Sequence, residues 1–587
     1  MESEGAPNVT QPQVTAQEER PPRAVPAIVL ATVLVCSGLI MWTAYFDEWL
    51  SPYIFDGDAE QHVWWTYRWS DPELFPRDLI YDFFSLPIFA PLGYQAVYRV
   101  LVPFVDAEKL SKALPVPLMV FSVLACFVAF RRWCKGGWLG PTLATFLFVL
   151  ICTRYFRGGL PRSFAMPVVA AFAWLSTSRR VWPLGVGLLI AVLFYPPPVT
   201  VLGLTSLAII FWRWRQGELA MKDLAAYAAI TILAVGVFLA CYTVGKPKWV
   251  GHRPTAAQVR SMPEFFSEEG GGHGRGAMFG TSPVDFYLTS QRTGLGIRTL
   301  YLMPLLVLGV VVAACRRFRD AVPALIPGMI VASLALFIAA HILLPRLFYP
   351  NRHVRYTMPV PILGLTALMI TWPAGAVAAR RPGARNFGRR YWWLALLPFV
   401  LLTAHRIAGA VHDARTLPPP DPSEAAVIEF CRQTPKDTLF AGLPSQMDPI
   451  PLLARRSVLA SHETALPHYL GYYSLVRARI EDELRLLHAT SWPEALGIAG
   501  KYGVGYVIVP RDLLDPKRPL ASPPHRELDV ELRKQAESKG AVMLNPPPGR
   551  RVLRTERYDI VDVRAPGKGG ATPSSSPSGD HFLKNSY

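Results

Sequence analysis

Two carboxylates stand close together in a stretch that is otherwise aromatic and apolar. Asp56 and Asp58 belong to the segment Tyr53–Trp65, directly after the first long apolar run of the chain. Ionisable residues held at the edge of a membrane predict a functional site. A positioned carboxylate can take the proton from an attacking hydroxyl, and carboxylate oxygens also bind Mg²⁺ and Mn²⁺. Asp56 and Asp58 are therefore the candidate catalytic residues, and Asp56 is also a candidate metal ligand.

More polar groups follow within one helical turn. Gln61 and His62 come three and four residues after Asp58, so with the two acids they could face one cavity. Gly57 would let the backbone turn tightly between the acids. The alternative is a solvated loop in which Asp58 caps a short helix, an arrangement that explains only one of the two acids.

Two later segments, residues 154–162 and 345–356, are rich in arginine. A guanidinium binds phosphate through two parallel hydrogen bonds, which predicts anion binding. The alternatives are contacts with lipid headgroups and anchoring at the membrane interface. The candidate substrate-binding residues of the chain are Gln61, His62, Arg157, Arg162, Arg352, His353 and Arg355.

Composition places these residues in a membrane protein. The chain has 587 residues, of which 51% are hydrophobic and 18% charged, whereas soluble proteins carry about 25% charged residues. The 60 Lys and Arg outnumber the 43 Asp and Glu. Because the arginines cluster at the ends of apolar runs, they follow the positive-inside pattern and do not indicate a nucleic-acid partner.

Apolar runs long enough to cross a bilayer alternate with these basic clusters, and hydropathy predicts about eleven spans. They occupy residues 27–46, 114–130, 137–153, 160–176, 181–195, 199–212, 224–244, 299–315, 321–344, 357–379 and 391–410. The alternation predicts a cytoplasmic N-terminus and places Asp56 and Asp58 outside. The stretch Leu79–Val105 is expected to lie along the interface.

The end of the chain differs in character. After the proline-rich linker Leu417–Pro422, segments of helical and strand type alternate, which predicts a small α/β domain. The expected organisation is a disordered cytoplasmic tail (1–26), a transmembrane domain (27–411) with outer loops 47–113, 245–296 and 345–355, an extracytoplasmic α/β domain (412–564) and a disordered tail (565–587).

The topology and motifs together resemble the GT-C superfamily of membrane glycosyltransferases. The segments that carry the resemblance are DGDAEQH (56–62), WSDPELFPRD (69–78), RGGLPRSFAMP (157–167) and PNRHVRY (350–356). They are similar to those of uncharacterised bacterial members. The oligosaccharyltransferase signature of the WWDYG type is missing from residues 412–564, which speaks against transfer to asparagine.

The resemblance implies a transferase of the hexosyl or pentosyl class in the bacterial plasma membrane. The donor would be a polyprenyl-phosphate-linked sugar and the acceptor a lipid, glycan or protein of the cell envelope. Asp56 or Asp58 would act as base, the other acid could orient the acceptor or hold a divalent cation, and the arginines would face the leaving phosphate. The alternative function is non-catalytic assembly, or transport, of lipid-linked or polysaccharide precursors.

Overall fold

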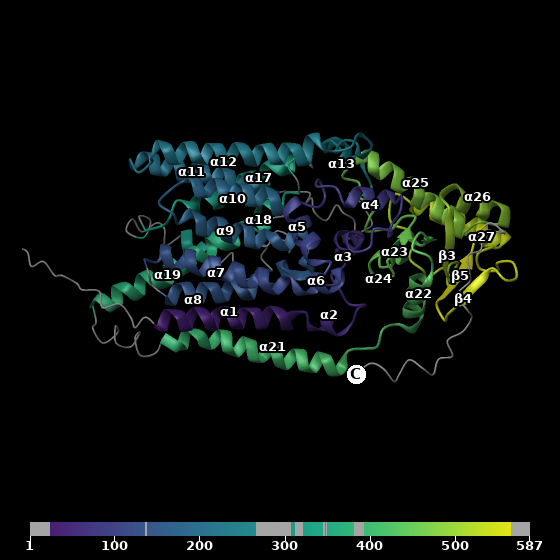
Figure 1. Cartoon of the computed structure of the whole chain (residues 1–587), viewed down its shortest axis with the longest axis horizontal. Coiled ribbons are helices and arrows are strands. Elements are labelled where there is room, and N and C mark those ends of the chain that lie inside the picture. Colours follow the sequence, from purple (N-terminus) through teal and green to yellow (C-terminus); the bar gives the residue numbers. More distant parts are fainter. Residues whose placement is uncertain are drawn as a thin grey trace, which may run out of the picture.

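The computed structural model describes residues 24–135, 138–265, 307–310, 318, 321–343, 347, 349–380 and 392–564. The predicted span 299–315 falls almost wholly outside these residues, as do both predicted tails and much of the loop 245–296. Figure 1 shows a helical bundle at one end of the described chain and a small sheet at the other.

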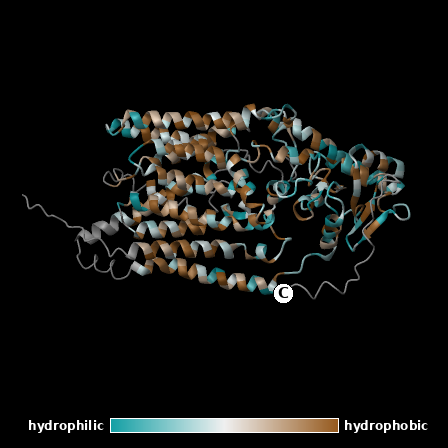
Figure 2. Ribbon diagram, viewed as in Figure 1, coloured by the Kyte–Doolittle hydropathy of each residue, from teal (hydrophilic) through white to brown (hydrophobic). Residues whose placement is uncertain are grey.

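Ten of the described helices form the bundle. They are α1 (Ala24–Ala44), α7 (Pro115–Trp133), α8 (Leu139–Cys152), α9 (Ala165–Ser176), α10 (Trp182–Phe194), α11 (Val199–Arg215), α12 (Met221–Leu239), α17 (Leu325–Ile342), α19 (Pro359–Arg380) and α21 (Leu397–Thr416). Helix α1 packs between α7 and α21, α8 packs on α19, and α10 packs on α12. Hydrophobic residues run along the whole length of these helices (Figure 2).

Six described helical segments are long and apolar enough to cross a membrane, judged by length and composition. The shorter apolar helices α8 and α10 accompany them. The chain is thus a multi-pass helical membrane protein, as its sequence predicts. The expected number of about eleven spans remains a prediction.

The basic clusters that follow α7, α9 and α11 meet at one end of the bundle. Arg132 donates to the hydroxyl of Thr177 at 2.6 Å, and Arg213 donates to the carbonyl oxygens of Arg179 and Ser178 at 2.8 and 2.7 Å. These contacts join the C-terminal ends of α7, α9 and α11. The alternation of basic clusters with apolar runs therefore corresponds to helices that return repeatedly to the same end.

Short helices cover the opposite end of the bundle, which we call the site end. They are α2 (Phe46–Leu50), α3 (Ala59–His62), η1 (Trp64–Trp69), α4 (Leu79–Phe84), α5 (Leu92–Leu101) and α6 (Ala107–Ala113). Asp78 caps α4 by accepting hydrogen bonds from the backbone N–H groups of Ile80 and Tyr81. At six and ten residues, α4 and α5 are too short to cross a bilayer. They agree with the interfacial arrangement expected for Leu79–Val105.

The C-terminal part of the chain folds as an α/β unit. Its strands are β1 (Leu439–Gly442), β2 (Ser457–Val458), β3 (Val504–Pro510), β4 (Arg551–Arg554) and β5 (Tyr558–Asp562), in the order β2-β1-β3-β5-β4. The first three strands are parallel, and β5 runs antiparallel to both β3 and β4. The helices are α22 (Pro422–Gln433), α23 (Pro444–Met447), α24 (Ile450–Leu453), α25 (Leu470–Leu487), α26 (Trp492–Tyr502) and α27 (Arg526–Lys539).

This α/β unit shares a hydrophobic core with the short helices at the site end. The rings of Phe83 in α4 and Tyr472 in α25 stack with centroids 3.8 Å apart. Arg455 forms an ion pair with Asp106, and its guanidinium lies 4.2 Å from the ring centre of Tyr67. The α/β unit is therefore packed against the end of the bundle that carries the predicted site.

Candidate functional site

A tight loop between α8 and α9 supports the first of the predicted acids. It consists of three short 3₁₀ turns over residues 153–164. Gly158 has φ +79°, and a Cβ added there would lie 2.9 Å from the Cβ of Asp56. Only glycine combines this left-handed conformation with so close an approach. The Gly-Gly pair of the motif RGGLPR thus lets the arginine loop pass directly against Asp56.

Arg162 joins the two predicted acids. Its Nη2 donates to both carboxylate oxygens of Asp56, at 2.6 and 2.7 Å, and its Nη1 forms an ion pair with Asp58. Asp56 is buried, at 7% exposed, while the side chain of Asp58 is 39% exposed. The two acids therefore differ in accessibility, and Asp58 is the one that can meet a substrate.

The structure does not show the alternative arrangement, in which Asp58 caps a short helix. Asp58 precedes α3, but its side chain makes no capping hydrogen bond to that helix. Gly57 is exposed, and its φ lies outside the left-handed region. A tight turn that requires glycine, expected between the acids, is therefore not present at Gly57.

A large cavity opens at the site end, with a volume of about 1890 Å³. Of the predicted residues, Asp58, Gln61, His62, Arg162, Arg352 and Arg355 line it. Asp56 lies beneath Arg162, outside the cavity lining. These groups come from three separate segments, residues 56–62, the loop between α8 and α9, and residues 352–355, so it is the packing of the helix ends that brings the motifs together.

Two predicted binding residues face elsewhere. Arg157 donates from Nε to Glu48 at 2.5 Å, and its guanidinium lies 5.0 Å from the ring centre of Tyr45. His353 is buried, with Nε2 2.7 Å from the carbonyl oxygen of Leu347. Neither residue lines the cavity. Arg157 already has a carboxylate partner, and this pairing explains why it is not available there.

Three arginines of the cavity lack such a partner. Among the described residues, no carboxylate lies within 4 Å of Arg154, Arg352 or Arg355. Arg352 donates to the hydroxyl of Tyr356 at 2.8 Å, and Arg355 lies over the ring of Tyr155 at 5.1 Å. The Nε of Arg355 is buried without a hydrogen-bond partner in the described part of the chain. Arg154 is exposed, whereas Arg352 and Arg355 are half-buried. Because an uncompensated charge away from water is costly, the wall formed by Arg352 and Arg355 is suited to an anion.

Gln61 and His62 lie beside these arginines but interact differently. Gln61 donates to Glu463 of the α/β unit. The ring of His62 stacks on Phe89 at 4.5 Å, and its carbonyl oxygen accepts from the hydroxyl of Tyr94 at 2.8 Å. Burial, together with the charge of Arg352, lowers the pKa of His62 to about 3. The imidazole is therefore neutral and a weak base at physiological pH.

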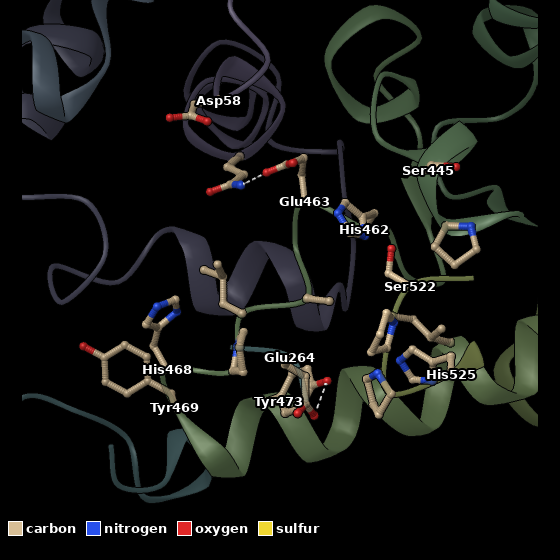
Figure 3. Close-up of a pocket in the computed structure, with 18 of the residues that line it drawn as sticks. Asp58, Glu264, Ser445, His462, Glu463, His468, Tyr469, Tyr473, Ser522 and His525 are labelled. Carbon is tan, nitrogen blue, oxygen red and sulfur yellow. Dashed lines mark hydrogen bonds between the residues drawn. The ribbon is translucent and has the colours of Figure 1, made fainter. Parts of the chain in front are cut away.

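The opposite side of the cavity consists of residues that the motifs did not single out. Figure 3 shows Glu463 near Asp58, with His462, Ser522 and His525 along one side and Glu264 and Tyr473 along another. Nothing in their local sequence marks them, because Glu463 is 402 positions from its partner Gln61. Glu60, next to the motif acids, also has a perturbed environment: burial and the nearby Asp448, Glu463 and Asp56 raise its pKa to about 8.

The contacts of Asp56 and Asp58 also decide whether these acids could bind a metal ion. In the described residues, no three or more His, Cys, Asp or Glu side chains gather as a metal would require. Both oxygens of Asp56 accept from Arg162, and Asp58 is paired with the same guanidinium. The donor set around Asp56 therefore does not fit a divalent cation, and the positive charge next to the acids comes from Arg162 and, 3.9 Å from Asp56, from Arg157.

Comparison with known proteins gives structural neighbours only. No protein-family model matches the chain, and no curated protein matches its sequence. Among solved structures, it is similar to AglB, the oligosaccharyltransferase of Archaeoglobus fulgidus in complex with an inhibitory peptide and a dolichol-phosphate, with TM-score 0.45, 13% identity and coverage of 83% of this chain and 70% of that chain. It is also similar to ArnT from Cupriavidus metallidurans bound to undecaprenyl phosphate, with TM-score 0.47, 15% identity and coverage of 93% and 100%.

Both similarities have TM-scores below 0.5 and identities of 15% or less, so neither assigns a superfamily to this chain. The likeness is loose, and no residue of this chain takes its role from either structure.

Proposed function

We propose that this chain is a membrane glycosyltransferase that moves a sugar from a polyprenyl-phosphate-linked donor to an acceptor hydroxyl at the outer face of the plasma membrane. The observation that carries the proposal is the meeting of an accessible carboxylate, Asp58, with three arginines that have no carboxylate partner among the described residues. A purely structural role would not require an acid and uncompensated cations from three segments to line one cavity.

The chemistry follows from these positions. The acceptor oxygen forms a bond to the anomeric carbon of the donor sugar, while the bond from that carbon to the phosphate oxygen breaks. Asp58 accepts the proton of the attacking hydroxyl. The electron pair of the breaking bond stays on the polyprenyl phosphate, whose developing negative charge faces Arg154, Arg352 and Arg355.

Asp56 has a supporting role in this mechanism. Its carboxylate holds Arg162 through two hydrogen bonds, and Arg162 in turn pairs with Asp58. The pair fixes the direction of the Asp58 carboxylate. Asp56 is thus a positioning residue, and Asp58 is the base.

No step of this mechanism uses a metal ion, which can be checked directly. We expect activity to persist in the presence of EDTA, because Arg162 supplies the positive charge at the acids. Activity that is lost with the chelator and returns with Mg²⁺ or Mn²⁺ would contradict this arrangement and restore the predicted metal role of Asp56.

The proposed orientation places the N-terminus in the cytoplasm and the site end, with residues 412–564, outside. Its support is that the basic clusters after α7, α9 and α11 meet at the opposite end of the bundle. Reporter fusions before Pro26 and at Pro418 test it. A reporter at Pro418 that is active only in the cytoplasm would overturn the orientation and with it the outer-face reaction.

The decisive experiment measures donor turnover. The full chain, reconstituted in lipid nanodiscs, is supplied with radiolabelled polyprenyl-phosphate hexoses and pentoses and with a cell-envelope extract as acceptor. We expect transfer of label from at least one donor, and its loss in Asp58→Asn. Donor binding with no turnover of any donor would instead favour the alternative, a non-catalytic assembly or transport protein.

A further inference from the structure

The cavity is larger than one ligand requires. Pockets for a single small molecule have volumes of about 300–1000 Å³, whereas this cavity measures about 1890 Å³. Arg154, Arg352 and Arg355, which have no carboxylate partner among the described residues, lie on its membrane side, and the α/β unit contributes Arg518, Arg526, Arg533 and Arg557. The remaining lining comes from the α/β unit and from the segment after α13 (Ala256–Ser261), where Glu264, Ser522 and His525 lie.

His525 is a buried polar side chain with an unused ring nitrogen. The residue is 7% exposed, and its Nδ1 has no hydrogen-bond partner among the described residues. Burial lowers its pKa to about 4, so the ring is neutral at physiological pH. Figure 3 shows the ring at the cavity, beside Ser522. A neutral imidazole can donate or accept one hydrogen bond at each nitrogen, and here one nitrogen is left for a ligand.

Two side chains of helix α27, Asp529 and Arg533, hold the loop that precedes His525. Asp529 accepts from the backbone N–H of Ala521 at 2.8 Å, and Arg533 donates to the carbonyl oxygen of Pro519 at 3.0 Å. Asp529 and Arg533 are themselves buried and paired at 3.1 Å. This part of the cavity wall is therefore built, and His525 does not owe its position to a mobile surface loop.

Glu264 supplies a second unused group. Its side chain is 7% exposed, and its Oε1 accepts from the hydroxyl of Tyr473 at 2.9 Å. The other oxygen, Oε2, is buried without a hydrogen-bond partner in the described part of the chain. Arg477 of α25 lies near both groups: its Nη1 is 3.9 Å from Glu264, and its charge acts on His525.

We infer that Glu264, Ser522 and His525 form a second subsite, which binds a neutral, hydroxyl-rich glycan as the acceptor. Sugar hydroxyls can donate to the carboxylate and both donate to and accept from the imidazole and serine groups, which satisfies the two unpartnered atoms. The assignment as acceptor rests on the proposed function, since the arginines on the membrane side take the donor phosphate. The glycan then extends from Asp58 into the α/β unit.

The test measures glycan binding separately from transfer. The full chain in nanodiscs is applied to an array of neutral hexose and pentose oligosaccharides, and the strongest oligosaccharide is titrated in solution. We expect His525→Ala and Glu264→Gln each to weaken its binding at least tenfold, because each removes a ligand hydrogen bond. Binding of undecaprenyl phosphate, used as the donor probe, should stay within twofold in both variants.

Two further variants keep the result interpretable. Lys534→Ala alters an exposed residue of the same helix, α27, and should bind both probes as the wild type does. Arg352→Ala should lose undecaprenyl phosphate and retain the oligosaccharide. Thermal unfolding confirms that each variant is folded, and Ser522→Ala replaces His525→Ala if the latter is not.

The outcomes separate the two proposals. The subsite is contradicted if no oligosaccharide binds the wild type, or if folded His525→Ala and Glu264→Gln bind it unchanged. Oligosaccharide binding that depends on these residues, in a protein that turns over no donor, would support the subsite and remove the glycosyltransferase.

Discussion

The membrane side of the cavity and the side formed by the α/β unit differ in how their arginines are paired. On the membrane side, Arg352 and Arg355 belong to the short helix α18 (Arg352–Arg355) and have no carboxylate within 4 Å among the described residues. On the opposite side, Arg533 is paired with the buried Asp529, and the atoms without a partner among the described residues include the Nδ1 of His525 and the Oε2 of Glu264. One side is thus prepared for an anion and the other for hydroxyl groups.

The same contrast appears within one loop. Arg157 and Arg162 are five residues apart in the motif RGGLPR, yet Arg157 is paired with Glu48 away from the cavity and Arg162 holds both acids of the site. An arginine becomes a candidate ligand group only when the fold leaves its charge unmatched. Counting arginines in a motif does not reveal this.

The largest expected effect is at the accessible acid. Asp58→Asn should keep the fold but lower transfer activity 10²- to 10⁴-fold, because an amide cannot take the proton of the attacking hydroxyl. Initial rates of label transfer, with thermal unfolding of the same samples, measure both. Asp71→Asn is the matched control, since Asp71 forms a surface pair with Lys436. A stable, fully active Asp58→Asn would remove the base from the mechanism.

A somewhat smaller effect is expected on the membrane side of the cavity. Arg352→Ala should weaken donor binding about 10- to 100-fold, since a hydrogen bond to a charged group contributes about 1.5–3 kcal/mol. Arg352→Lys should recover only part of this, because lysine keeps the charge and loses the planar fork. Titration with undecaprenyl phosphate measures both variants. Unchanged binding in Arg352→Ala and in Arg355→Ala would contradict the anion site.

The arginine loop itself offers a third test. Gly158→Ala should lower activity about tenfold or more, because the new Cβ would press on Asp56 and a displacement of about 1 Å in a reacting group can cost 10²-fold. The left-handed conformation adds a destabilisation of about 1–2 kcal/mol. Gly57→Ala is the control: a Cβ there meets nothing within 4 Å. Equal activity and stability in the two variants would argue against the close packing of this loop on Asp56.

The smallest effect is expected at Glu60, whose carboxyl group lies near Asp448 and Glu463 of the α/β unit. Burial raises the pKa of Glu60 to about 8 from an ordinary value near 4.5. Its protonated form therefore favours the folded state below about pH 4.5, and this contribution is lost as the pH rises through 8. We expect Glu60→Gln to unfold at a higher temperature than the wild type at pH 8.5, and at nearly the same temperature at pH 5.

A thermal unfolding series across this range provides the measurement. If the difference between the two proteins does not change with pH, Glu60 does not titrate in this interval. The related variant Glu463→Gln reports on the same cluster from the α/β unit, because Glu463 is one of the charges that raise the pKa of Glu60.

Much of the architecture could be predicted from the sequence. Apolar runs flanked by arginines predicted the helices α1, α7, α8, α10, α11, α17 and α19 to within a few residues, whereas α21 begins and ends six residues later than predicted. Segments of alternating type after residue 422 predicted β1, β3, α22, α25 and α26. Such features are encoded locally, since hydropathy and the residues that end a helix act over one element at a time.

The structure brings only some of the predicted site residues to one cavity. Asp58, Gln61, His62, Arg162, Arg352 and Arg355 do line one cavity, while Arg157 and His353 do not. The motifs indicated which residue types gather at the site end, but not which charges would be neutralised inside the protein. Glu48, the partner of Arg157, lies 109 positions away in sequence and carries no local signal of that pairing.

The sequence by itself determined the membrane-spanning character, the end of the bundle at which the acids and arginines gather, and the strands and helices of the α/β unit, because each depends on local patterns of apolar, basic and turn-forming residues. Only the tertiary structure decided that Asp56 is buried beneath Arg162, that Asp58 is the accessible acid, and that Glu264 and His525 complete the opposite side of the cavity. Burial and ion pairing are set by contacts between segments far apart in the chain, and such contacts exist only once the helices and the sheet have packed together.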